Sequence, residues 1–158
     1  MQVYFLRHAD ATWPNWDRPD DERPLTKKGK KQSRRVGKWL ANHGVNPSVV
    51  LTSPLPRASE TAEIAVNEIG AQVQVEPALG KSFNAQQLMP LLVKYAGQDI
   101  VLVGHEPDFS TVIGALTGGA VKLAKAGVAR VDVGDARAGR GELVWLLTPN
   151  ILKKKKKV

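Results

Sequence analysis

The sequence predicts an α/β protein, a single three-layer α/β/α sandwich around a mainly parallel sheet with an antiparallel edge. Over residues 1–118, short apolar runs alternate with amphipathic segments, which is the pattern of strand–helix units. The run at 100–103 is apolar at every position, as in a central parallel strand that is covered on both faces. Two further strand-like segments follow with a glycine-rich turn between them, which predicts a hairpin at one edge of the sheet.

The elements follow from local pattern. The first strand is the apolar run 3–6, which opens the chain. Residues 9–24 are rich in Pro, Asp, Asn and Trp and predict a long loop. Thr26 is the expected N-cap of the first helix, which should stop near Gly44. The remaining strands are expected at 49–51, 72–75, 100–103, 127–133 and 142–147, and the remaining helices at 57–69, 84–96 and 108–116.

Length and composition limit the class of protein. The 158 residues fit one domain, which we assign to residues 1–152, followed by a Lys-rich tail at 153–158 that we expect to be disordered. Cysteine is absent, which excludes disulfides and thiolate sites. No apolar stretch reaches ~18 residues, so no membrane partner is expected. No basic leader precedes the first strand, and a cytoplasmic location is the expectation.

The formal net charge of +8 raises the question of nucleic-acid binding. Five of these charges lie in the run 153–157, and a second basic cluster lies on the first predicted helix. No aromatic residues are interleaved with them, as a single-strand binding platform would require. The basic helix is therefore interpreted as a solvated face, and no specific nucleic-acid partner is expected.

Polar side chains follow three of the predicted strands. They are Arg7 and His8 after the strand at 3–6, Ser53 and Arg57 after the strand at 49–51, and His105 and Glu106 after the strand at 100–103. If these strands are neighbours, the side chains converge at the carboxyl edge of the sheet, where ligands of α/β proteins bind. Two arginines and two histidines suit a dianion such as a phosphoryl group. No cluster with metal-ligand spacing is visible, so neither a metal nor a cofactor is expected.

The same segments resemble the signatures of the histidine phosphatase superfamily, which includes the phosphoglycerate mutases. Residues 6–9 resemble its Arg-His-Gly/Ala signature, residues 52–62 its second signature and residues 103–107 its third. Residues 24–29 resemble its helix-opening Leu-Thr-x-x-Gly. The short chain is most similar to the compact SixA-type phosphohistidine phosphatase branch. The resemblance implies a phosphoglycerate mutase-like fold and a metal-independent phosphatase.

The resemblance also implies roles for individual residues. His8 would be the nucleophile that becomes phosphorylated, with its other ring nitrogen held as a donor by a backbone carbonyl. Arg7 and Arg57 would bind the phosphoryl oxygens. His105 would donate a hydrogen bond or a charge to the same group, most easily as imidazolium. The reference pKa of an imidazole is ~6.5, and the neighbouring arginines should favour neutral His8.

The proton donor stays open. Many members of the superfamily carry a glutamate in the segment that corresponds to 77–80, and no carboxylate stands there in this chain. The alternatives are Glu106, Glu76 and four aspartates of the loop beside His8, namely Asp10, Asp17, Asp20 and Asp21. Imidazole leaves from phosphohistidine more readily than an alkoxide leaves from a sugar phosphate. A site without a dedicated acid is therefore better matched to P–N cleavage.

The leading hypothesis is a monomeric phosphohistidine phosphatase that acts on a phosphohistidine-containing protein. The same residues would also serve a phosphomonoesterase whose substrate is a small phosphorylated molecule. A third possibility is a non-catalytic module that binds phosphorylated partners. Trp13 and Trp16, in the loop after His8, either line the mouth of the site or pack the loop onto the body.

Overall fold

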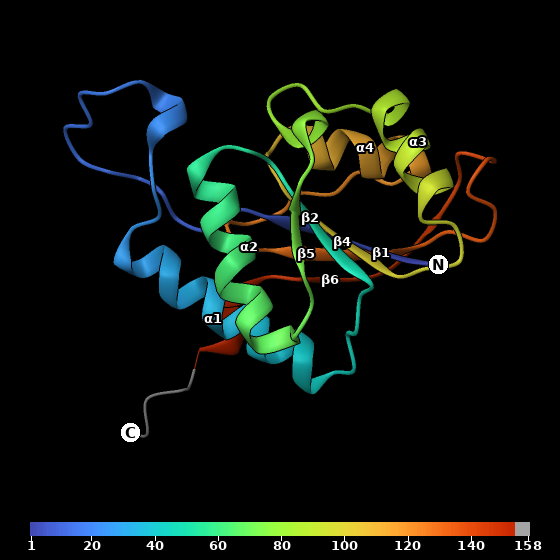
Figure 1. Ribbon diagram of the computed structural model, residues 1–158, viewed down its shortest axis with the longest axis horizontal. Helices are drawn as coiled ribbons and strands as arrows, with labels where there is room; N and C mark the ends of the chain where they lie inside the picture. The colour runs from blue at the N-terminus through green and yellow to red at the C-terminus, as the bar shows by residue number, and fades with distance from the viewer. Residues whose placement is uncertain (154–158) are drawn as a thin grey trace.

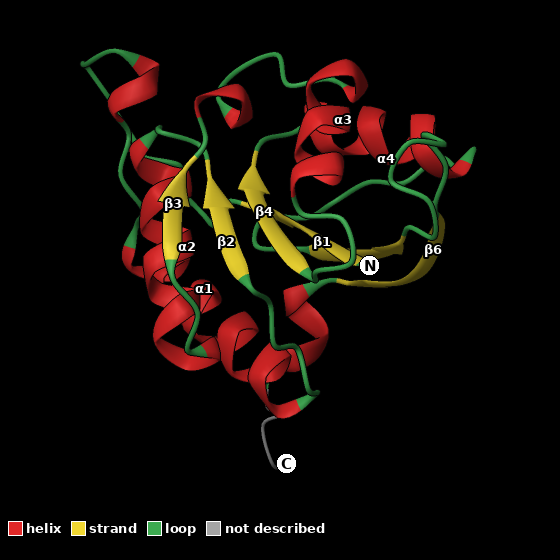
Figure 2. Cartoon of the chain, turned by 45° about the vertical axis from the view of Figure 1, so that its right-hand side comes forward, coloured by secondary structure: helices red, strands yellow, loops and turns green. Residues whose placement is uncertain are grey.

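The strands form one mixed sheet in the order β3-β2-β4-β1-β5-β6 (Figure 2). The structure is a computed structural model that describes residues 1–153, so 154–158 of the predicted Lys-rich tail lie outside the described residues. The strands are β1 (Gln2–Arg7), β2 (Val49–Thr52), β3 (Val73–Val75), β4 (Ile100–Gly104), β5 (Val128–Asp132) and β6 (Glu142–Leu147). The first four run parallel, whereas β5 pairs antiparallel with β1 and β6 antiparallel with β5. The predicted edge hairpin is confirmed.

Helices cover both faces of the sheet, which confirms the three-layer sandwich (Figure 1). The helices are α1 (Lys27–Asn42), α2 (Pro56–Ile69), α3 (Ala85–Lys94) and α4 (Asp108–Thr117). Side chains of α1 and α2 share one apolar core with the sheet, and side chains of α3 and α4 share the other. No described helix has the length and apolar composition needed to cross a membrane.

The two cores explain why the central strands are continuous apolar runs. Along β1, Val3 and Phe5 enter the core under α3 and α4, while Tyr4 and Leu6 enter the core under α1 and α2. All four side chains are buried, as are all residues of β4. Since neither face of these strands meets solvent, the hydrophobic pattern cannot alternate.

Helix boundaries differ from the predicted ones by one or two residues. Thr26 is the N-cap of α1 as predicted, and its hydroxyl accepts a hydrogen bond from the Gly29 N–H. The helix α2 begins one residue early because Pro56 fits the first helical position. The predicted loop 9–24 contains one turn of 3₁₀ helix, η1 (Asp20–Glu22). Two further 3₁₀ turns are η2 (Pro77–Leu79) and η3 (Pro149–Leu152).

The strand order brings the predicted functional segments together. In the sheet β4 lies between β1 and β2, and all three are parallel. In the strand register Arg7 is opposite Gly104, and Thr52 is opposite Val103. The residues that follow the three strands therefore start from one edge of the sheet, as the sequence predicted.

Gly104, the last residue of β4, offers a test of this packing. A Cβ atom at this position would lie 2.7 Å from Cζ of Phe109, a fully buried ring that packs edge-on against Phe5. We expect Gly104→Ala to lower the free energy of unfolding by about 1–3 kcal/mol, measured by urea denaturation. Gly134→Ala is the control, since no atom lies within 4 Å of its added Cβ. Equal stability of the two variants would contradict this account.

Candidate active site

A cleft of about 480 Å³ lies at the carboxyl edge of the sheet. The predicted site residues that line it are Arg7, His8, Arg57, His105 and Glu106. The rings of His8 and His105 have centroids 5.3 Å apart and planes inclined by 54°. The predicted convergence of three strand ends is thus observed in the structure.

Hydrogen bonds with the backbone of neighbouring segments hold His8 in place. Its N–H donates to the Gly104 carbonyl at 3.0 Å, and its carbonyl accepts from the Ala126 N–H at 3.1 Å. The ring Nδ1 lies 2.8 Å from the Ala9 carbonyl. Because a carbonyl can only accept, Nδ1 carries the proton and Nε2 keeps its lone pair. This agrees with the tautomer that the resemblance implied.

Burial keeps the ring of His8 neutral. The side chain is almost completely enclosed, and desolvation lowers its pKa from 6.5 to about 3. The hydrogen bond to Ala9 opposes this shift, while the charges of His105, Arg57 and Arg7 add to it. The predicted neutral form is supported, although burial contributes more than the arginines that the sequence analysis named.

Burial also determines the ionisation of His105. It lowers the pKa of this ring to about 4, and the positive charge of Arg57 lowers it further. Without a bound phosphoryl group His105 is therefore neutral near pH 7, while the imidazolium that the resemblance implied concerns the phosphoryl-bound site and stays a prediction. The Ser53 hydroxyl accepts from the Leu55 N–H at 3.1 Å, and its only other partner among the described residues is His105 Nε2 at 2.8 Å. We therefore assign the hydroxyl hydrogen to this second contact, because the opposite assignment would leave the hydroxyl without an acceptor. The ring proton of His105 then resides on Nδ1.

The arginines leave donors unpartnered at the cleft. Arg7 Nη1 donates to the Leu123 carbonyl at 2.9 Å, and Arg57 Nη1 donates to the Asp20 carbonyl at 3.2 Å. Among the described residues, three buried side-chain nitrogens lack a hydrogen-bond partner, and all belong to residues that line the cleft: Arg7 Nε, Arg57 Nε and His105 Nδ1. Buried donors normally find an acceptor, and an oxyanion supplies several.

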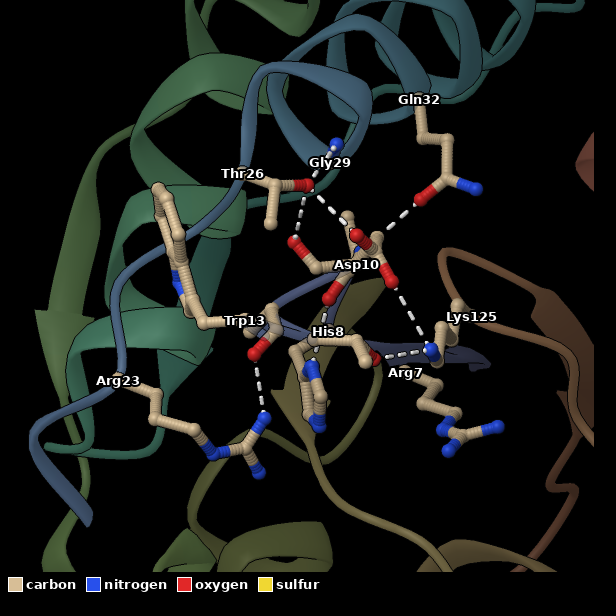
Figure 3. A network of polar contacts seen from close by, with 12 residues as sticks. Arg7, His8, Asp10, Trp13, Arg23, Thr26, Gly29, Gln32 and Lys125 are labelled. Carbon is tan, nitrogen blue, oxygen red and sulfur yellow. Dashed lines mark hydrogen bonds and ion pairs between the residues drawn. The ribbon is translucent and has the colours of Figure 1, made fainter. Parts of the chain in front are cut away.

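Asp10 belongs to a network of polar contacts beside His8 (Figure 3). Its carboxylate accepts from Thr26 Oγ1 at 2.6 Å and from Lys125 Nζ at 2.9 Å, and its N–H donates to Gln32 Oε1. Burial alone would raise the pKa of Asp10, but the hydrogen bonds from Thr26 and Lys125 lower it to about 2. Asp10 therefore stays ionised near pH 7, which disfavours it among the alternatives for the proton donor. A Cβ on Gly29 would lie 2.1 Å from the Asp10 carbonyl, so only glycine permits this close approach.

Two glutamates were candidates for the proton donor. Glu106 lines the cleft, and its two oxygens accept hydrogen bonds from the Ser110 N–H and the Ser110 hydroxyl. Its catalytic role stays a prediction. Glu76 instead accepts from the Ala78 N–H and caps η2, and it is not among the residues that line the cleft.

The three other aspartates of the loop differ in whether they line the cleft. Asp20 lines the cleft and pairs with Arg23 at 2.8 Å, while its carboxylate is 3.7 Å from Arg57. Asp21 does not line the cleft, but it pairs at 2.5 Å with Lys81, which does. Asp17 is exposed and is not among the residues that line the cleft. The acidic loop thus compensates cationic groups around the cleft.

Three cations of the cleft were not predicted: Arg23, Lys81 and Lys125. Lys81 comes from a loop with no distinctive pattern, whereas Arg23 directly precedes the segment 24–29 that resembles a superfamily signature. One signal could have identified Lys125, since it precedes β5, whose first residue pairs with Leu6 near the end of β1. An antiparallel neighbour of β1 must begin where β1 ends, beside His8.

Trp13 and Trp16 form hydrogen bonds with the backbone of the loop that contains them. The Trp13 indole donates to the Pro24 carbonyl at 2.8 Å, and the Trp16 indole donates to the Pro19 carbonyl at 3.1 Å. Their rings lie near one another, with centroids 6.3 Å apart. Neither is among the residues that line the cleft, so the packing interpretation is favoured over the substrate mouth.

Comparison with known proteins identifies the family. Residues 3–82 match the sequence model of the histidine phosphatase superfamily (branch 1). The chain belongs to this superfamily. An uncharacterized protein of Picosynechococcus sp. is 37% identical to it over 96% of this chain and 99% of that protein. The phosphohistidine phosphatase SixA of Escherichia coli is 28% identical over the full length of both chains.

Solved structures agree with this assignment. The protein histidine phosphatase SixA complexed with tungstate has a TM-score of 0.87 and 27% identity, covering 97% of this chain and all of that one. The predicted phosphoglycerate mutase-like fold is confirmed, and the chain is a phosphatase of the superfamily. The described residues contain no group of three or more His, Cys, Asp or Glu side chains that could hold a metal ion.

The ionisation of the two site histidines can be measured by NMR. We expect neither His8 nor His105 to take up a proton between about pH 8 and about pH 5, where an ordinary imidazole with a pKa of ~6.5 titrates. Ring signals followed through a pH titration report this, with His8→Ala and His105→Ala for assignment. A site signal that titrates near pH 6.5 would contradict the burial argument.

The same shift has a consequence for stability. Both folded-state pKa values lie below 6.5, the ordinary value of an imidazole in an unfolded chain. Below this pH the unfolded chain binds more protons than the folded chain, so the free energy of unfolding should fall as the pH falls toward about 4. Urea denaturation at several pH values measures the slope, and His8→Ala should reduce it.

Proposed function

We propose that this chain hydrolyses phosphohistidine carried by a protein, through a phosphorylated intermediate at His8. One observation carries the proposal, namely that the unprotonated Nε2 of His8 shares a cleft with three buried, unpartnered donors. These donors are the side-chain nitrogens of Arg7, Arg57 and His105. A nucleophile without a proton beside a set of oxyanion donors suits phosphoryl transfer, in which the protein mainly positions groups and neutralises charge.

In the first step His8 attacks phosphorus. The lone pair of Nε2 forms a new N–P bond while the bond between phosphorus and the substrate imidazole breaks. The leaving nitrogen keeps the bonding pair, and the substrate ring departs as a neutral imidazole because its other nitrogen already carries a proton. Arg7, Arg57 and the Nδ1–H of His105 donate to the phosphoryl oxygens, whose charge is spread over three equatorial positions.

In the second step water attacks the phosphorus of phosphorylated His8. A P–O bond forms, the P–Nε2 bond breaks, and Nε2 regains its lone pair as inorganic phosphate leaves. The Ala9 carbonyl holds Nδ1–H throughout, so the ring returns in the same tautomer.

The choice of phosphohistidine rests on the leaving group. Asp10 is held as a carboxylate, and both oxygens of Glu106 accept hydrogen bonds from Ser110. An imidazole leaves well once it is protonated, so it depends less on a dedicated acid than an alkoxide does. Similarity to SixA over the whole chain supports the same substrate class. The cytoplasmic location and the monomeric state remain parts of this proposal, and the catalytic role of Glu106 stays a prediction that this mechanism does not use.

Replacement of the nucleophile tests the mechanism. We expect His8→Ala to lower kcat for phosphate release from a phosphohistidine protein by at least about 10³-fold. Radiolabelled phosphate should be trapped as an acid-labile adduct in the parent protein and not in the variant. His43→Ala is the control because His43 is exposed at the C-cap of α1. Unchanged turnover in His8→Ala, or a strong preference of the parent protein for sugar phosphates, would overturn the proposal.

Ser53 is assigned a positioning role through His105. Ser53→Ala removes the hydrogen bond to Nε2 and frees the ring to adopt the other tautomer. We expect kcat to fall about tenfold, which corresponds to about 1.4 kcal/mol. Nitrogen chemical shifts of the His105 ring should show Nδ1 losing its proton population. Ser48→Ala, at the opposite end of β2, is the control. A full loss of folding or an unchanged tautomer would contradict this role.

A further inference from the structure

The solvent-facing side of α1 carries a strong uncompensated positive charge. Its cations are Lys27, Lys28, Lys30, Lys31, Arg34, Arg35 and Lys38, and the helix contains no acidic residue. None of the seven forms an ion pair with another residue in the described part of the chain. The sequence analysis interpreted this cluster as a solvated face, but a solvated helix usually mixes both signs of charge.

The order of charges on α1 opposes helix stability. Lys27 and Lys28 occupy the first turn, where the helix dipole favours anions, and the first turn holds no acidic residue. Lys31 and Arg35 repeat the same charge one turn apart, which is unfavourable. Packing of the apolar side of α1 against α2 outweighs this cost. Residues that destabilise the helix in which they lie are expected at functional sites, so the basic residues of α1 indicate a function.

The C-terminal segment adds to this charge. The turn η3 packs against α1, and Figure 1 shows this turn, in red, beside that helix. A surface groove of about 630 Å³ lies between the two segments, lined by Lys31, Arg34, Arg35, Lys38, Leu152 and Lys153. Five of these six side chains are cationic, and the sequence continues with four further lysines. Residues more than 100 positions apart thus form one basic surface.

The shape and composition of the groove favour one class of partner. On the other side of α1, Glu60 and Glu63 of α2 share a hollow with Lys30 and Arg34, so the excess charge faces η3. A concave groove suits an extended segment better than a flat bilayer. No aromatic side chain lines it, so bases of a nucleic acid would find no stacking platform. Carboxylates of a peptide segment match its charge and its shape.

The groove also lies within reach of the catalytic cleft. The N-cap of α1, Thr26, bonds to Asp10, which is two residues after His8. From Lys27 to Lys38 the helix rises about 17 Å, at 1.5 Å per residue. About six residues of extended chain span this length, at roughly 3.3 Å each. A segment on the groove and a phosphohistidine in the cleft can therefore belong to one polypeptide.

We infer that the α1 face and the groove bind an acidic segment of the phosphorylated protein substrate. The inference rests on the proposed phosphohistidine phosphatase activity and adds the feature by which a protein substrate is selected. The groove is lined by residues entirely different from those of the cleft, so its side chains affect binding and not the chemical step. Binding that depends on charge is screened by salt.

Two synthetic phosphohistidine peptides test the inference. In one, about six glutamates follow the phosphohistidine after a flexible spacer of about six residues, and in the other glutamines replace the glutamates. We expect kcat/KM for the acidic peptide to be at least about tenfold higher at low salt. The advantage should disappear at high salt and in the variant K31Q/R34Q/R35Q/K38Q. The control variant K94Q/K122Q/R137Q/R140Q removes four exposed charges elsewhere and should keep it.

The outcomes separate the two proposals. Equal kcat/KM values for the two peptides would overturn the inference that the groove binds an acidic segment, and the proposed phosphatase activity would be unaffected. Failure to hydrolyse the peptides and free phosphohistidine overturns the proposed function. In that case fluorescence anisotropy of the two unphosphorylated peptides still measures whether the groove binds the acidic segment. Binding to phosphatidylserine vesicles or to polyuridylate that requires the same four cations, with no binding of the acidic peptide, also overturns the inference.

Discussion

The rest of the site depends on the burial of two imidazole rings beside two guanidinium groups. Four cations at such short range would repel one another, and desolvation would add to the cost. The fold avoids this because His8 and His105 lose their protons when they are enclosed. The arginines keep theirs, and they are held by the carbonyls of Leu123 and Asp20. One constraint thus produces both a neutral nucleophile and a positively charged cradle.

The position of the nucleophile follows from a network that joins three distant segments. Lys125, from the loop before β5, bonds to Asp10 and Thr12, and Asp10 bonds to Thr26 at the start of α1. The absence of a side chain at Gly29 lets the helix terminus approach the Asp10 carbonyl. An ionised carboxylate with two strong donors holds this junction, so Asp10 contributes position and not a proton. Loss of Lys125 would leave the largely buried charge of Asp10 without its ion-pair partner.

The sequence predicts the strands well because both faces of the central sheet are buried and the runs at 3–6 and 100–103 have no polar interruption. It also predicts that residues after three strands share one edge, since that follows from parallel pairing. It does not predict the charge state of His105, because burial is a property of the folded chain. Lys81 and Arg23 are missed for a related reason, as their loops reach the cleft only through tertiary packing.

The neutral state of His105 has a consequence for catalysis. A phosphoryl dianion that enters the cleft adds negative charge beside this ring, which favours its protonated form. The substrate therefore raises the affinity of His105 for a proton, and the site becomes more cationic only when an anion is present. When phosphate leaves, the same burial expels the proton and restores the unliganded state. A ring that must take up a proton when phosphate binds weakens the binding of phosphate by the free energy of that protonation, whereas a permanently charged ring would not.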